Sequence, residues 1–118
     1  MDDTETHVRK FHKELSAGIV SLVLLGVLAR ARTPMYGYQI VKRLEATGEG
    51  VLSDKQSALY PVLRNLSASG LLDSHVEPSV SGPPRRYYRI TPLGQDVLQD
   101  WAGTWNTTRQ FVDSVLKG

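Results

Sequence analysis

The sequence contains no cysteine, which excludes disulfide bridges and sites in which thiolates hold a metal. Its three histidines, His7, His12 and His75, lack the close pairing that favours metal chelation. No combination of serine, histidine and aspartate carries a supporting catalytic motif, and no glycine-rich phosphate loop is present. We therefore expect no enzyme, no metal and no other cofactor.

Long hydrophobic runs are also missing. The richest apolar run extends over eleven residues, from Ile19 to Ala29, and includes Ser21 and Gly26, whereas a membrane-spanning helix needs about 18 apolar residues. The first residues, Met1 to Thr6, are acidic and polar, unlike a secretory or transit leader. We expect a cytoplasmic protein without a membrane partner. The length of 118 residues and the hydrophobic content of 41% are enough for one domain.

A strong overall charge is absent, because the formal net charge is only +2. The charges are unevenly distributed, however, since residues 6–92 contain twelve Lys and Arg against six Asp and Glu. Such an excess of positive charge is typical of surfaces that bind nucleic acid, because each neutralised phosphate releases condensed counterions. A solvated basic surface has the same composition, so charge alone does not decide between the two.

Hydrophobic periodicity predicts two helices in the first part of the chain. From Leu15 to Arg32 apolar residues lie all round the helical wheel, which is typical of a helix buried on most faces. Thr33-Pro34 ends this helix, because proline disfavours helical backbone at the preceding residue. A second helix is predicted from Tyr36 to Glu45, and Gly48-Glu49-Gly50 ends it. Its apolar stripe consists of Ile40, Val41 and Leu44.

A third helix is predicted from about Lys55 to Ser69. A start at Ser53 would resemble a capping box but would place Pro61 deep in the helix, so a start between Lys55 and Ser57 is favoured. One side of this helix is apolar, and the opposite side is free for a partner. The residues on that opposite side are Ser57, Tyr60 and Arg64.

Two strand-like runs, Leu71–Glu77 and Arg85–Thr91, flank a stretch rich in Pro, Ser and Gly and predict a β-hairpin with a long tip. Thr91-Pro92 then provides an N-cap and a first-turn proline for a final helix. Alternation along the second strand separates two pairs of side chains. Tyr88 and Ile90 are expected on one side, and Tyr87 and Arg89 on the other.

The final segment contains a heptad pattern, in which residues recur at alternating spacings of four and three. The pattern consists of Gly94, Leu98, Trp101, Trp105, Thr108, Val112 and Val115. A lone helix on so small a domain could hardly bury both tryptophans against its own body, so a second copy of the chain is the expected partner. Gly103 costs about 1 kcal/mol of helix propensity, so either the helix bends there or close packing compensates.

Three motifs occur in a fixed order along the chain. They are Tyr36-Gly-Tyr-Gln-Ile, Leu59-Tyr-Pro-Val-Leu-Arg-Asn-Leu with Gly70-Leu-Leu, and Gly82-Pro-Pro-Arg-Arg-Tyr-Tyr-Arg-Ile-Thr-Pro-Leu-Gly. Together they resemble the PadR family of bacterial transcriptional regulators, in its compact branch, from about Leu15 to Trp105. The resemblance implies a mainly α fold with a β-hairpin wing: a polar tail or arm over residues 1–12, a winged helix-turn-helix over 13–91, and a dimerisation helix over 92–118.

The resemblance also implies a homodimer that binds double-stranded DNA and represses transcription until an effector binds. Carried over by motif position, the DNA-facing residues are Tyr60 and Arg64 of the third helix and Arg85, Arg86 and Tyr87 of the wing. In some relatives the tryptophan matched by Trp105 lines a cavity between subunits that accepts flat aromatic or phenolic compounds. Residues 53–58 depart from the commoner small-residue version, so base preference is not carried over.

The residues themselves add further candidates. The start of a recognition helix normally points into the major groove, which makes Lys55, Gln56 and Ser57 the expected base readers. Tyr38 and Gln39 are expected at the DNA from the second helix. For the dimer interface, which is also the expected effector site, the candidates are Leu98, Trp101, Trp105, Thr108 and Val112.

Each candidate also has a purely structural interpretation. Tyr60 could pack on the helix flank, Arg85 and Arg86 could be a solvated pair, and the residues at the start of the third helix could act as caps. The tryptophans could pack fully together without leaving room for a ligand. A winged helix that docks to a protein is the alternative function, and elution from heparin only at high salt would argue for DNA instead.

Overall fold

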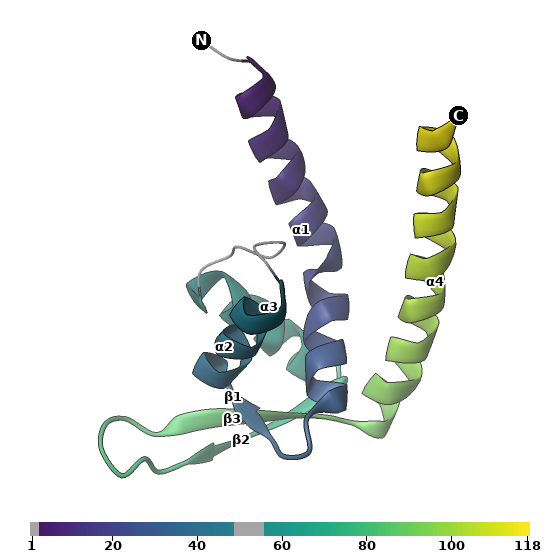
Figure 1. Ribbon diagram of the computed structural model, residues 1–118. Helices are drawn as coiled ribbons and strands as arrows, with labels where there is room; N and C mark the ends of the chain where they lie inside the picture. Colours follow the sequence, from purple (N-terminus) through teal and green to yellow (C-terminus); the bar gives the residue numbers. More distant parts are fainter. Residues whose placement is uncertain (1–2, 49–55) are drawn as a thin grey trace.

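The computed structural model describes residues 3–48 and 56–118, and in these ranges it contains four helices and a three-stranded sheet (Figure 1). The elements are α1 (Asp3–Arg30), β1 (Met35–Tyr36), α2 (Gly37–Gly48), α3 (Gln56–Ala68), β2 (Leu72–Glu77), β3 (Arg85–Ile90) and α4 (Pro92–Lys117). The predicted fold class, mainly α with a β-hairpin, is confirmed. β1 is an additional strand that the sequence pattern did not reveal, because only two residues form it.

α1 is the central helix, and it contacts α2, α3, α4 and β3. Its C-terminal half carries the buried side chains Val20, Leu24, Leu25 and Leu28. The helix begins at Asp3, so most of the expected polar tail is helical and extends away from the body of the protein (Figure 1). Two acidic residues in the first turn complement the helix dipole, and Glu5 pairs with Arg9 one turn later at 3.8 Å.

By length and composition alone, α1 is long and apolar enough to cross a membrane. The apolar run of eleven residues in the sequence did not lead us to expect this. The core helix of a soluble protein meets the same criteria. α1 packs against helices on more than one side and contributes four residues to the hydrophobic core. We therefore interpret it as the central helix of a folded domain.

α2 and α3 complete the core with the apolar stripes that periodicity predicted. The buried residues of these stripes are Ile40, Leu44, Leu59, Leu63 and Leu66. α3 begins at Gln56, within the expected interval, and Pro61 is accommodated inside it. Gly70 ends α3 with φ +81°, the left-handed conformation that glycine tolerates. Leu71 N donates to Leu66 O and Gly70 N to Ser67 O, as in a Schellman motif.

The sheet has the strand order β1-β3-β2, and both pairings are antiparallel. Tyr36 lies opposite Tyr87, and Tyr87 lies opposite His75 on the other side. The predicted alternation along β3 is confirmed, because Tyr88 is buried in the core while Tyr87 is only half-buried and Arg89 is exposed. The β2–β3 hairpin extends beyond the body on the side of α2 and α3 (Figure 1), where a wing is expected.

The start of α4 is anchored to the body of the same chain. Thr91 is the predicted N-cap: its Oγ1 accepts from Gly94 N at 2.9 Å and donates to Gly70 O at 2.7 Å. A Cβ at position 94 would collide with the carbonyl oxygen of Leu71 and would approach Ile90 Cγ1 to 2.7 Å. Gly94 therefore faces its own domain, although the heptad pattern suggested a role in the seam with a partner.

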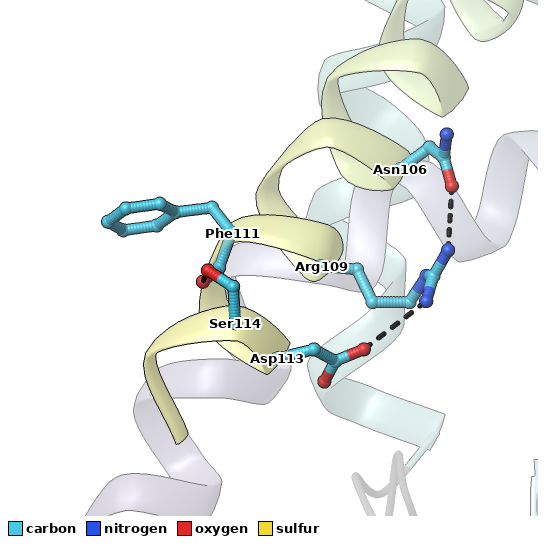
Figure 2. Close-up of polar contacts among 5 residues, drawn as sticks. All are labelled: Asn106, Arg109, Phe111, Asp113 and Ser114. Atoms are coloured by element: carbon cyan, nitrogen blue, oxygen red, sulfur yellow. Dashed lines mark hydrogen bonds and ion pairs between the residues drawn. The ribbon is translucent and has the colours of Figure 1, made fainter. Parts of the chain in front are cut away.

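The rest of α4 changes character along its length. Leu98 and Trp101 are half-buried against the core, whereas Trp105, Phe111 and Val115 are exposed. The helix is continuous through Gly103. Figure 2 shows its polar side, where Arg109 donates to Asn106 Oδ1 at 2.8 Å and Asp113 Oδ2 at 3.3 Å, with the Phe111 ring on the other side. The distal half of α4 thus has one polar side and one exposed apolar side.

Candidate nucleic-acid interface

Candidate DNA-contacting residues from α3 and from the wing surround one hollow of about 300 Å³. The hollow lies where the end of β1, the start of α2, α3 and the base of the wing meet. Its lining residues are Tyr36, Gly37, Tyr60, Arg64, Pro84, Arg85, Arg86 and Tyr88. Three guanidinium groups from two separate elements therefore converge on one concave surface.

Tyr60 joins the start of α2 to α3. Its ring packs on Gly37, because a Cβ built at position 37 would lie 2.7 Å from Tyr60 Oη and 2.8 Å from Tyr60 Cζ. Any side chain at position 37 would displace this ring, so the glycine of the Tyr36-Gly-Tyr motif is required by close packing. Tyr60 is half-buried yet still lines the hollow, so packing on the helix flank and access to the hollow occur together.

Arg64 and Arg86 line the hollow together with Tyr88. Arg64 is exposed on the polar side of α3, one turn after Tyr60. Arg86 donates from Nη1 to Ser74 Oγ at 2.9 Å across the hairpin. Burial raises the pKa of Tyr88 above its ordinary value of 10.0, and the positive charges of Arg86 and Arg64 partly oppose that rise.

The raised pKa of Tyr88 predicts a loss of stability at alkaline pH. Folding favours the neutral phenol, because the pKa of Tyr88 is higher in the folded than in the unfolded chain. The contribution of Tyr88 to the free energy of unfolding is therefore fully present below about pH 10, its pKa in the unfolded chain, and is lost as pH rises through its pKa in the folded chain. We expect the free energy of unfolding, measured with urea, to fall less steeply above pH 10 in Tyr88→Phe than in the wild type. Parallel curves for the two proteins would contradict the assignment.

Arg85 has a different environment from Arg86. Its Cζ lies 4.4 Å from the centroid of the Tyr36 ring, within the range of a cation–π contact. Tyr36 also packs edge to face on Tyr87 at 5.3 Å, and Tyr87 stacks on His75 at 5.6 Å. Among the described residues neither Arg85 nor Arg64 forms an ion pair with a carboxylate, so both charges are available to a polyanion.

The start of α2 forms a second cationic surface beside the first. Gln39 Oε1 accepts a hydrogen bond from Tyr36 N at 3.1 Å. This bond is the second half of a capping box and satisfies one backbone N–H at the start of α2. Tyr38 is exposed, stacks on Tyr36 at 6.5 Å and lies under Lys42 Nζ at 5.5 Å. An adjoining open hollow of about 450 Å³ includes Arg32, Tyr38, Gln39, Lys42 and Arg43.

The expected base readers fall at the edge of what the structure describes. Lys55 lies outside the described residues. Gln56 and Ser57 are the first two residues of α3, and their side chains also lie outside the described part. Their position at the start of α3 agrees with the expected helix boundary, and their contact with bases stays a prediction.

Three of the five residues expected at the dimer interface and effector site line an open groove of about 550 Å³ between α1 and α4. Trp101, Trp105 and Thr108 form the α4 wall, and Leu15, Ile19 and Leu22 lie on the α1 wall. Leu98 packs on the core instead, and Val112 is exposed beyond the groove. Trp101 is half-buried against its own chain, whereas Trp105 remains 41% exposed. One of the two tryptophans is therefore largely covered without any partner.

Three residues of the candidate interface were not singled out from the sequence. They are Tyr36, whose ring lies under the Arg85 guanidinium, His75, which stacks on Tyr87, and Lys42, whose Nζ lies over the Tyr38 ring. The Tyr36-Gly-Tyr motif was the available signal, but only the pairing of β1 with β3 brings its first tyrosine to the wing. In the described ranges, no three His, Asp or Glu side chains come together as metal ligands.

Comparison with known proteins identifies close likenesses over most of the chain. A model of the transcriptional regulator PadR-like family matches residues 24–100. The structure is similar to that of a PadR family transcriptional regulator from Eggerthella lenta, with a TM-score of 0.79 and 33% identity over 96% of this chain and 95% of that one. An uncharacterized protein from Lysinibacillus sphaericus is 26% identical over 98 residues, which are 83% of this chain and 87% of that protein.

A further similar structure is that of Bacillus subtilis PadR in complex with operator DNA. Its TM-score is 0.63 at 24% identity, and the match covers 71% of this chain but only 46% of the Bacillus chain. This likeness concerns the fold, and it covers less than half of the Bacillus protein.

Proposed function

The chain belongs to the PadR-like family of transcriptional regulators, and from that premise we propose that it represses transcription in the cytoplasm by binding a palindromic operator as a homodimer. Members of this family are regulators and not enzymes. The observation that carries the proposal is the convergence of Arg64, Arg85 and Arg86 on one hollow between α3 and the wing. A guanidinium grips phosphate oxygens through two parallel hydrogen bonds, which makes this hollow suited to the DNA backbone.

The arrangement of the elements supports a particular docking geometry. α3 is the helix for the major groove, with Lys55, Gln56 and Ser57 at its start as base readers. In this geometry the wing brings Arg85 and Arg86 to the DNA backbone beside α3. Tyr38, Gln39 and Tyr87 each contact Tyr36, so we expect them near the same stretch of DNA. The similar fold of Bacillus subtilis PadR was determined in complex with operator DNA, and we propose that this chain also binds DNA.

Selection of genomic fragments with the purified full-length protein tests the proposal. A dimer with two recognition helices requires half-sites about one helical turn, roughly 10 bp, apart. We expect the recovered fragments to share an imperfect palindrome with this spacing. A promoter that contains the site and drives a reporter should be silenced when the protein is co-expressed. Fragments that share no symmetric sequence, or a reporter that is activated, would contradict the proposal.

The groove between α1 and α4 supports a second part of the proposal, namely release of DNA by a flat aromatic or phenolic effector. Its volume of about 550 Å³ lies within the usual range of small-molecule sites, and Trp101 and Trp105 form part of an apolar wall. In a two-fold dimer the same groove occurs twice, and the partner would cover its open side. Planar rings stack favourably on indoles at offset distances.

An effector can release DNA only if it binds the DNA-free arrangement more tightly than the DNA-bound one. We expect planar phenolics or cationic dyes to quench tryptophan fluorescence and to weaken operator binding by roughly 5- to 150-fold, the usual range of coupling between two sites. Trp105→Ala should lose most of the quenching and of the release. Quenching that persists in this variant, or a bound ligand that leaves operator affinity unchanged, would count against the mechanism.

A further inference from the structure

A row of aromatic side chains crosses the exposed side of the sheet. Tyr36 of β1, Tyr87 of β3 and His75 of β2 are direct cross-strand neighbours in the register. Their rings are in contact in the same order, edge to face between Tyr36 and Tyr87 at 5.3 Å and stacked between Tyr87 and His75 at 5.6 Å. Cross-strand aromatic pairs of this kind stabilise a sheet. The row therefore ties the base of the wing to the strand that leads into α2.

The position of Arg85 depends on this row. Its Cα lies opposite Glu77, which would be its natural ion-pair partner across the hairpin. Glu77 Oε2 is instead held by His75 Nε2 at 2.6 Å, and the Arg85 guanidinium lies over the Tyr36 ring at 4.4 Å. Tyr36 is diagonal to Arg85 across the β1–β3 pair, a distance that a long side chain can reach.

A cation–π contact leaves the positive charge of the guanidinium without a carboxylate partner, so Arg85 can still donate to a phosphate. The contact also restricts the flexible arginine to one region before DNA arrives, which lowers the entropy that binding must remove. An ion pair with Glu77 would have occupied the same donors and neutralised the charge.

We propose that Tyr36 is a positioning residue for DNA binding, whose ring holds the Arg85 guanidinium in place for a backbone phosphate. This inference rests on the proposed function, because it assigns the wing arginine a partner in DNA. It adds a residue of β1, outside both α3 and the wing, to the determinants of affinity. The pairing of β1 with β3 at Tyr87 and Tyr88 brings the Tyr36 ring within reach of Arg85.

A double-mutant cycle on the full-length protein tests the coupling. The four proteins are the wild type, Tyr36→Leu, Arg85→Ala and the double variant, with affinity measured on a fixed DNA duplex. Loss of a cation–π contact predicts that Tyr36→Leu weakens binding roughly 2- to 5-fold, and that it has no further effect once Arg85 is absent. Tyr36→Phe keeps the ring and should lose much less affinity than Tyr36→Leu. Losses that multiply in the double variant would overturn the inference.

A spectroscopic measurement tests the same contact without DNA. In the free protein the NMR signals of the Arg85 side chain should be shifted upfield by the Tyr36 ring, and Tyr36→Phe should preserve that shift. Arg85 signals at ordinary positions in the wild type would overturn the inference even if Tyr36→Leu fails to fold. If Arg85→Ala binds DNA like the wild type, the wing contact of the proposed function fails and the inference with it. If Arg85→Ala weakens DNA binding but the losses multiply in the double variant, the inference about Tyr36 fails while the proposed function stands.

Discussion

Alanine at Arg64 is expected to weaken binding to operator and to random duplexes alike, by about tenfold or more, because a charge-assisted contact to phosphate is lost. The slope of log K against log salt should become shallower by about one for each phosphate contact removed. The double variant Arg85→Ala/Arg86→Ala should make this salt slope shallower by about two. The measurement is a titration of DNA binding at several salt concentrations.

Arg89 offers a matched control on the same strand. It is exposed like Arg85, but its guanidinium already pairs with Asp73 at 3.5 Å. Arg89→Ala therefore removes one positive charge from the wing region without removing a guanidinium from the hollow. We expect the salt dependence to remain that of the wild type. A salt slope unchanged by the Arg64 variant, or equally reduced by the Arg89 variant, would show that the hollow is not the phosphate site.

Glutamate at two exposed apolar positions of α4, Val112→Glu with Val115→Glu, is expected to convert a dimer into a monomer. Both side chains are exposed in the single chain, at 43% and 59%, so the fold of the chain should tolerate the change. In a two-fold dimer each new charge occurs twice, and the juxtaposed or buried carboxylates cost several kcal/mol. Light scattering should then report 13.1 kDa, the mass of one chain, instead of twice that value.

Gln110→Glu provides the control for this prediction, because it adds a negative charge to the same turns of α4 at an exposed position that lies about 160° round the helix from Val112. This variant should remain dimeric. Operator affinity should fall with the loss of the dimer, since a monomer can engage only one half-site. A double-glutamate variant that keeps the mass of a dimer would exclude this side of α4 as the interface.

These substitutions separate dimerisation from folding, which removal of the whole helix would not do. The first turns of α4 are part of the domain itself, since Gly94 is packed against Leu71 and Ile90, and Leu98 and Trp101 cover the core. A chain ending at Thr91 would therefore lose core contacts together with any dimer contacts. The first half of α4 thus belongs to the core of its own chain, whereas the distal half leaves a continuous apolar side exposed for a partner.

The sequence alone determined the features that depend on near neighbours in the chain. The apolar periods of α2 and α3, the Thr91 cap with Pro92, the glycine terminator at Gly70 and the alternation along β3 were all predicted and are confirmed. Each is local physics, because helix and strand periods, caps and turns are decided within a few residues. The ordered motifs of the chain also led to the family that the comparisons identify.

The tertiary structure alone decided which distant residues share a site. Nothing in the sequence around Tyr36 indicates that its ring lies under the Arg85 guanidinium. Nor does it indicate that Gly37 is required because the Tyr60 ring lies against it. The same holds for Trp101, which the heptad pattern assigned to a partner and which the core of its own chain half covers. The physical reason is that these contacts depend on how the elements pack, and each ring or guanidinium takes the partner that packing brings within reach.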